Sequence, residues 1–276
     1  MKFLESLRLH PRLAWAGLLI YAAAVTFPHE QVQLLVGKIA DLLTRPGLYR
    51  LSAAVALVLA AWATVMLFRR LRGHSQRRTI AAYWALTLFL IWCNWRVFTA
   101  NDTELVHYPQ YFPAGAVLMA MTLSPVESLA WIALLGGLDE AYQYWVLYPR
   151  RVSALDFNDI YMDLLGGAAG MVFAAAFLYR PKGRVPIAKR AGVLTLAAVI
   201  ASGFVLRAIG VMALRQDEPA PHWFALSRQK PGPFWSVVPA LGPHYIHELT
   251  PLEGTLLILA TIAVYGVFER IVSRPS

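Results

Sequence analysis

Long apolar runs separated by short polar segments dominate this chain. A helix needs about 20 mostly apolar residues to cross a bilayer. Residues 28–48 instead place apolar residues at helical spacing among polar ones, which is typical of a helix in the membrane interface. The pattern predicts an all-α, polytopic transmembrane helix bundle with about eight spans. The expected spans are residues 12–28, 49–68, 79–98, 105–123, 125–148, 158–179, 191–213 and 251–268.

Composition agrees with this pattern, and the Lys and Arg positions predict an orientation. Hydrophobic residues make up 58% of the chain and charged residues only 15%, against roughly 25% charged in soluble domains. Short loops rich in Lys and Arg face the cytoplasm, and the richest here are 69–78 and 180–190. We therefore expect both termini in the cytoplasm and the loop 214–250 outside. Because basic loops account for the net charge of +9, no nucleic-acid partner is expected.

The expected spans divide the chain into three parts. Residues 1–78 form an N-terminal hairpin with the interfacial segment, residues 79–180 a four-helix core, and residues 181–276 a C-terminal hairpin with the long outer loop. The single cysteine, Cys93, excludes an intrachain disulfide and a cysteine metal site. The motif at Ser124–Glu127 matches a capping box with proline at the first helical position, so a helix should begin there.

Polar residues near the predicted outer ends of three consecutive spans mark a candidate site. Ionisable groups in a span are costly and are a functional hypothesis by default. We expect these residues to converge on one outward-opening pocket. The candidate ligand-binding residues are His107, Tyr111, Glu140, Gln143, Arg150, Arg151, Asp156, Asp159 and Asp163. Four of them are also candidate catalytic residues: His107, Glu140, Asp159 and Asp163.

Glu140 is the strongest single signal. It lies about eight residues, or roughly 12 Å of helix, below the outer end of its span. Gln143 lies one turn further out on the same face. The alternative interpretation is a protonated glutamate that hydrogen-bonds to a neighbouring helix. An intramembrane carboxylate more often marks a site or a proton path, so we favour a functional role.

The span that follows carries an acidic face. Asp159 and Asp163 share that face with Gly166 and Gly170. The glycine pair permits close approach of a partner helix, which would press the aspartates against it. For Asp156 and Asp159 the alternative is ordinary capping of the helix N-terminus. Three carboxylates this close imply a cation nearby, either an arginine, a metal ion or a shared proton.

His107 and Tyr111 are four residues apart at the start of their span. Such residues are usually part of the interfacial aromatic belt, but a histidine beside several acids is also suited to proton transfer. Arg150 and Arg151 could grip a phosphate or pair with a carboxylate. The sequence therefore leaves both interpretations open for His107 with Tyr111 and for Arg150 with Arg151.

The order of these residues resembles the VanZ-like family of bacterial membrane proteins. The resemblance covers about residues 104–170, within the four-helix core. It rests on His107 with Tyr111, Glu140-x-x-Gln143, Arg151, the Asp156–Asp159 turn and Asp163-x-x-Gly166-x-x-x-Gly170. Asp163 stands where the family has asparagine, and Thr103-Glu104 replaces an acidic-basic pair. The resemblance implies a multi-pass protein of the bacterial cytoplasmic membrane, possible involvement in teicoplanin resistance, and no settled molecular activity.

Three functions fit these residues. The first is binding of an anionic envelope lipid or its headgroup at the outer face, with arginine taking the phosphate. The second is an enzyme that uses metal or acid–base chemistry on a lipid-linked substrate; a divalent cation such as Mg²⁺ would suit the carboxylates. The third is a proton-coupled transporter or flippase that uses Glu140. Membrane lipids are the expected partners, no cofactor is required, and the oligomeric state is left open.

Overall fold

The computed structural model describes residues 6–7, 9–100, 103–150, 152–178, 190–219, 221–229, 232–238 and 244–272. These residues are mostly helical, which confirms the all-α prediction, and a helix lies at each of the eight predicted spans. The predicted interfacial segment forms α3. The α-helices are α2 (Pro11–Thr26), α3 (His29–Leu43), α4 (Arg45–Leu71), α5 (Arg77–Val97), α6 (His107–Thr122), α7 (Pro125–Tyr142), α8 (Phe157–Leu178), α9 (Ala191–Ala208) and α10 (Pro251–Val272). A 3-10 turn, η1 (Glu104–Val106), precedes α6, and a π-helical turn, η2 (Gln143–Leu147), extends α7.

Five of the described helices, α4, α5, α8, α9 and α10, are long and apolar enough to cross a membrane. Helix α2 is apolar but shorter. Apolar helices of this length fit a membrane protein. The spanning role of α2, α6 and α7, and with it the number eight, stays a prediction.

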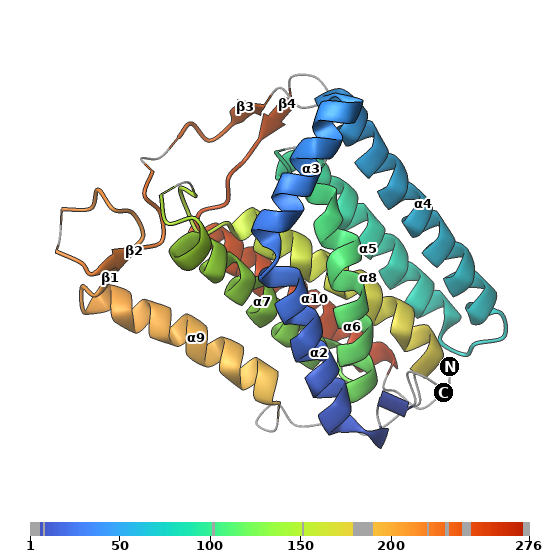
Figure 1. Cartoon of the computed structure of the whole chain (residues 1–276). Helices are drawn as coiled ribbons and strands as arrows, with labels where there is room; N and C mark the ends of the chain where they lie inside the picture. The colour runs from blue at the N-terminus through green and yellow to red at the C-terminus, as the bar shows by residue number, and fades with distance from the viewer. Residues whose placement is uncertain are drawn as a thin grey trace.

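Helix α8 forms the core of the bundle, with α5, α6 and α7 packed around it (Figure 1). In its most apolar stretch 89% of the residues are buried, against 11% in α4 and 6% in α9. A helix that is apolar on all sides belongs in a protein core or faces lipid. Burial therefore separates the central α8 from α4 and α9, whose apolar side chains suit contact with lipid.

Helices α6 and α8 touch backbone to backbone. A Cβ atom on Gly170 would lie 1.8 Å from the Phe112 carbonyl oxygen, and one on Gly115 would lie 1.9 Å from that of Gly167. No side chain fits in either place. The close approach expected at Gly166 and Gly170 is thus present, and α6 is the partner helix.

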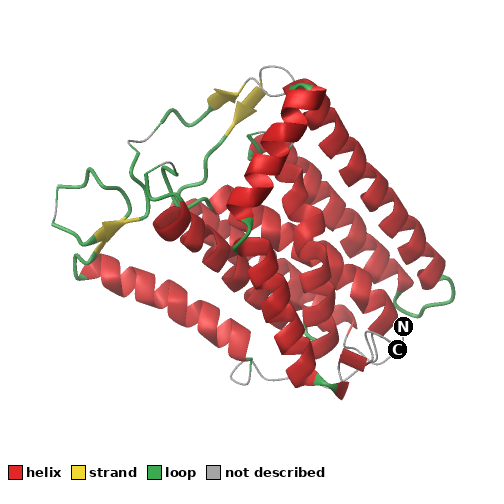
Figure 2. Cartoon of the chain, viewed as in Figure 1, coloured by secondary structure: helices red, strands yellow, loops and turns green. Residues whose placement is uncertain are grey.

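Four short strands lie outside the bundle (Figure 2). Strands β1 (Met212–Ala213) and β2 (Phe224–Ala225) pair in parallel. Strands β3 (Ser236–Val238) and β4 (His244–Ile246) pair antiparallel. Strands β2, β3 and β4 lie in the segment 214–250 that was predicted as a long loop, whereas β1 lies at the end of the span predicted for residues 191–213, because α9 ends at Ala208. Segments of two or three residues carry no readable periodicity, so the sequence pattern did not predict them.

The start of α7 follows the predicted capping motif only in part. The Ser124 side chain accepts a hydrogen bond from the Glu127 amide at 3.2 Å, as expected of a cap. The Glu127 carboxylate accepts bonds from the amides of Gly192 at 2.7 Å and Val193 at 3.2 Å. Glu127 thus caps the first turn of α9 and ties that helix to α7.

Candidate functional site

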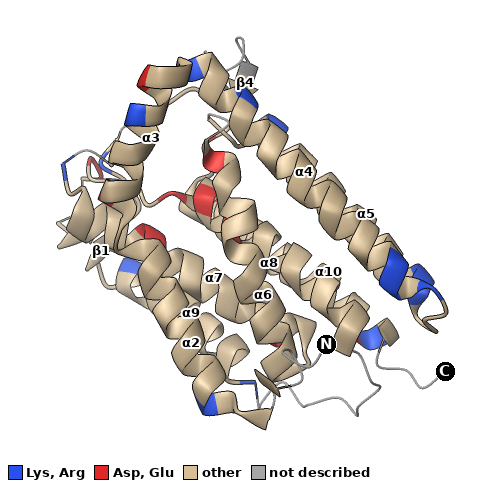
Figure 3. Ribbon diagram, turned by 45° about the vertical axis from the view of Figure 1, so that its right-hand side comes forward, with Lys and Arg blue, Asp and Glu red and all other residues tan. Residues whose placement is uncertain are grey.

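Figure 3 shows one group of acidic residues inside the bundle, near α6, α7 and α8, and others on α3 and in the loop beside β1. Helices α6, α7 and α8 bring most of the predicted site residues together near the end that carries η2. We call this set the acidic centre. Its members are His107, Tyr111, Asp139, Glu140, Gln143, Asp156, Asp159 and Asp163.

His107 joins two of the three helices. Its Nδ1 atom lies 2.9 Å from Asp163 Oδ1, within hydrogen-bond distance, and its Nε2 atom lies 3.8 Å from Asp159 Oδ2. His107 is 7% exposed and Asp163 is fully buried. An imidazole in this position donates its Nδ1 proton to Asp163, which leaves Nε2 as the acceptor. Nε2 therefore lies on the edge of the ring that is nearest to Asp159, whose side chain is 19% exposed.

The close contact of α6 with α8 produces this pairing. His107 is the first residue of α6 and Asp163 lies in the second turn of α8. A Cβ atom on Gly166 would meet the Tyr108 carbonyl oxygen at 2.6 Å. Tyr111, one turn along α6, is buried on the side of Asp163. The glycines therefore position the two members of the pair as well as the helices.

Glu140 points into the protein and not toward lipid. It is 2% exposed, and its Oε1 accepts a hydrogen bond from Gln143 Nε2 at 2.8 Å. The same amide nitrogen reaches Asp139 Oδ2 at 3.5 Å, at the limit of a hydrogen bond. Asp139 is 1% exposed. Gln143 therefore links two adjacent buried carboxyl groups at the end of α7.

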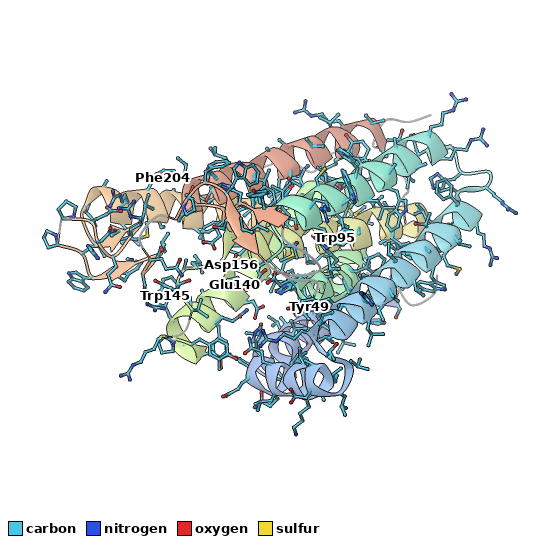
Figure 4. The ribbon with its side chains drawn as sticks, turned by 90° about the horizontal axis from the view of Figure 1, so that it is seen from above. Tyr49, Trp95, Glu140, Trp145, Asp156 and Phe204 are labelled. Carbon is cyan, nitrogen blue, oxygen red and sulfur yellow. The ribbon has the colours of Figure 1, made fainter. Side chains whose placement is uncertain are left out.

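Asp156 has a different environment. Its Oδ1 accepts hydrogen bonds from the amides of Asn158 at 2.8 Å and Asp159 at 3.3 Å. These bonds cap the start of α8, so for Asp156 the capping alternative is correct. Asp156 is exposed, yet in the view from above it lies beside Glu140 in the middle of the molecule (Figure 4). We infer that the acidic centre meets solvent on this side.

The two predicted arginines do not neutralise the acidic centre among the residues that the structure describes. Arg150 is exposed in a turn, with no ion pair or hydrogen bond to the described part of the chain. Arg151 lies outside the described residues. Among the described residues, His107 is the basic side chain that lies within 4 Å of carboxyl groups of the centre. Throughout the described ranges, no three or more His, Cys, Asp or Glu side chains are arranged to hold a metal ion.

Two oxygens of the acidic centre lack a hydrogen bond within the described residues: Asp139 Oδ1 and Asp163 Oδ2. Both are buried, and a Cβ atom on Gly136 would lie 2.8 Å from Asp163 Oδ2. A buried polar atom without a partner costs free energy. Each of the two oxygens can therefore accept a further hydrogen bond, from water or from a ligand.

Sequence reasoning missed Asp139 and the anchor of the α8 N-terminus. Asp139 stands four residues before Gln143, a spacing that could have shown it. Asn158 donates to the carbonyl oxygens of Phe98 at 2.7 Å and His247 at 2.9 Å. Its own side-chain oxygen accepts from the Leu249 amide at 2.8 Å. These contacts hold the start of α8 in place, and no local sequence signal predicts contacts 60 or more residues away.

No protein-family model, curated protein or solved structure matches the chain.

Proposed function

We propose that this chain is a VanZ-like, multi-pass protein of the bacterial cytoplasmic membrane whose acidic centre performs acid–base chemistry on a lipid-linked substrate. The observation that carries the proposal is the contact of 2.9 Å between His107 Nδ1 and Asp163 Oδ1. A buried carboxylate that holds one imidazole nitrogen leaves the other to take or give a proton. The arrangement supports the enzyme hypothesis over the other two.

Three residues have distinct parts in this chemistry. Nε2 of His107 takes a proton from a substrate hydroxyl or water and later returns it to the leaving group. Asp163 fixes the tautomer of the ring and stabilises its charged form. Asp159, 3.8 Å from Nε2, adds a negative charge on the open side, which favours the imidazolium.

Binding of an anionic headgroup at this same centre has less support. The carboxylates would repel a phosphate, and the exposed Arg150 forms no ion pair with them within the described residues. A proton-coupled transporter remains compatible with a buried Glu140. Glu140 accepts a hydrogen bond from Gln143 on the same helix face. This bond is equally consistent with a carboxyl group that only holds neighbouring side chains in position.

The proposal places the acidic centre on the outer side, with eight spans and both termini cytoplasmic. Figure 1 draws the start of α2 and the end of α10 at the end of the bundle where the Arg-rich α4–α5 connection lies. The positive-inside rule puts that end in the cytoplasm. In a Cys93→Ala background, Pro219→Cys should react with an impermeant thiol reagent from outside intact cells. Reaction only after the cells are opened would overturn the orientation.

The chemistry is testable without a known substrate. The protein in nanodiscs is incubated with bacterial envelope lipids, and the lipids are compared by mass spectrometry. The wild type should convert at least one lipid species, whereas His107→Gln should not and Asp163→Asn should be slower by about 10³-fold or more. Lys38→Gln, an exposed change on α3, is the matched control and should convert lipid as the wild type does.

Two results would contradict the proposal. Lipid that copurifies but is never converted would identify a binding protein, the first of the sequence-based hypotheses. Unchanged conversion by His107→Gln would exclude this imidazole as the acid–base group.

A further inference from the structure

A second polar hollow, of about 290 Å³, lies between η2 and the β1–β2 segment. The residues that matter for its chemistry line it from both sides. They are Tyr144, Trp145, Gln216, His222, Trp223 and Arg228. Tyr144 and Trp145 directly follow Gln143 in η2. In Figure 4, Trp145 points toward the β1–β2 segment, away from Glu140 and Asp156. π-helical turns are frequent at functional sites, and this one separates the hollow from the acidic centre.

The hollow is built on fixed side chains. Tyr144 is 1% exposed and donates its hydroxyl to the Ala225 carbonyl oxygen at 3.0 Å. Arg228 donates from Nη1 to the Val152 carbonyl oxygen at 2.7 Å and from Nη2 to that of Tyr144 at 3.1 Å. Its guanidinium carbon lies 3.8 Å from the centre of the Tyr144 ring. The cation is therefore held in one orientation before any ligand arrives.

The charge of the hollow is positive. Its described lining includes no Asp or Glu. In the described part of the chain Arg228 contacts uncharged carbonyl groups and an aromatic ring, and a guanidinium has five N–H donors. Gln216 and His222 bring further polar groups into the lining. Such a set favours an anion with several oxygen acceptors.

We propose that this hollow binds a phosphate group, the chemistry shared by a lipid headgroup and free phosphate. The exposed indoles at its rim, Trp145 at 40% and Trp223 at 89%, suit the headgroup level of a bilayer. The assignment of this phosphate to a lipid headgroup rests on the proposed function. The phosphate would bind at Arg228, so the acidic centre would not have to accommodate the anion.

The test titrates the protein in a neutral maltoside detergent with inorganic phosphate and, separately, with a short-chain phosphatidic acid. Chloride at equal ionic strength is the reference, and tryptophan fluorescence reports binding. Arg228→Gln should weaken phosphate binding by about tenfold or more, because a charged hydrogen-bond donor is lost. Arg215→Gln is the matched control, since Arg215 lies in the same segment but pairs with Asp217. Equal affinities in these two variants, or no preference over chloride, would overturn the proposal.

Arg228 also holds two backbone carbonyls, so its variant needs a second line of evidence. Gln216 and Trp223 are exposed and can be changed without loss of core packing. Gln216→Ala and Trp223→Ala should each weaken phosphate binding by about threefold. Wild-type affinity in both would contradict the assignment even if Arg228→Gln fails to fold.

The two sources of phosphate give different results. Tighter binding of the phosphatidic acid than of inorganic phosphate identifies a lipid headgroup, and equal affinity identifies the free anion. His107→Gln should bind phosphate as the wild type does. A failure of the acid–base proposal therefore leaves this test intact.

Discussion

Helix α7 carries a buried polar network at each end, and the two differ in how fully they are satisfied. At its start, Arg190 pairs with Glu269, and Glu269 also accepts a hydrogen bond from Ser124 at 2.7 Å. Glu127 is bound by backbone amides of α9. At its end, the acidic centre combines one histidine with several carboxyl groups, and two of its oxygens lack a hydrogen bond within the described residues.

The difference separates a structural network from a candidate site. In the first network each acid has a donor, and the described partners come from α7, α9 and α10, so it fixes helices to one another. In the acidic centre several carboxyl groups are gathered together, and the centre is open on one side at the exposed Asp156. A folded protein tolerates such unbalanced burial where the charge serves binding or chemistry. Variants of the two regions should therefore change different properties.

The largest expected effect on stability is in the structural network. Glu269→Gln removes the charge of Glu269 from its ion pair with Arg190, which is 7% exposed, and breaking a buried pair costs about 3–5 kcal/mol. The free energy of unfolding in detergent should fall by that amount. The neighbouring exposed change Arg270→Gln should have almost no effect. If Glu269→Gln is as stable as Arg270→Gln, this network does not hold the helices together.

The next effect concerns the contact between α6 and α8. Gly170→Ala places a methyl group 1.8 Å from the Phe112 carbonyl oxygen, so the helices must separate. We expect a loss of about 1–3 kcal/mol, as for overpacked cores, measured by thermal unfolding. Because the His107–Asp163 contact depends on this approach, lipid conversion should fall too. Gly203→Ala, where no atom lies within 4 Å, is the control.

A smaller effect of opposite sign is expected in the acidic centre. Asp139→Asn keeps the shape of the side chain, removes a buried negative charge and adds a donor. We expect stability to be unchanged or higher by up to about 1 kcal/mol, with a loss of any activity that uses the charge. A loss of stability comparable to that of Glu269→Gln would place Asp139 in a structural network instead.

The smallest effect is a pH dependence outside the bundle. Burial would raise the pKa of the Glu218 carboxyl, but hydrogen bonds from Arg207 and from the amides of Arg215 and Leu214 lower it below 4.5. A lowered folded pKa gives stability that is complete above the unfolded value and is lost as the pH falls through the folded one. The protection of the amides of residues 211–219 against hydrogen exchange, relative to the intrinsic rate at each pH, should thus fall below about pH 4.5. In Arg207→Gln, exchange should be faster already at neutral pH.

The sequence predicted much of the helical framework. A helix lies at each of the eight apolar runs, and helical spacing of apolar residues predicted α3. Local composition is sufficient for such predictions, because a segment in an apolar solvent must satisfy its backbone hydrogen bonds internally. Local spacing also predicted that Asp163 shares a face with Gly166 and Gly170. The sequence left the contacts of Arg150 and Asp156 undecided, because they depend on the path of the loop between α7 and α8; the structure shows Asp156 capping α8 and Arg150 exposed in a turn. Strands as short as β1 and β2 contain too few residues to show an alternating apolar pattern in the sequence.

By itself, the sequence determined which residues are costly to bury, and therefore where a polar site could form. Only the tertiary structure decided the partners. Backbone contact between α6 and α8 brings His107 to Asp163, 56 residues away, and Arg228 crosses 84 residues to reach Tyr144. Hydrophobicity and helical spacing act within a few turns of one helix. Which acid meets which base depends instead on how closely separate helices pack, and here that is set by glycines on both sides of one contact.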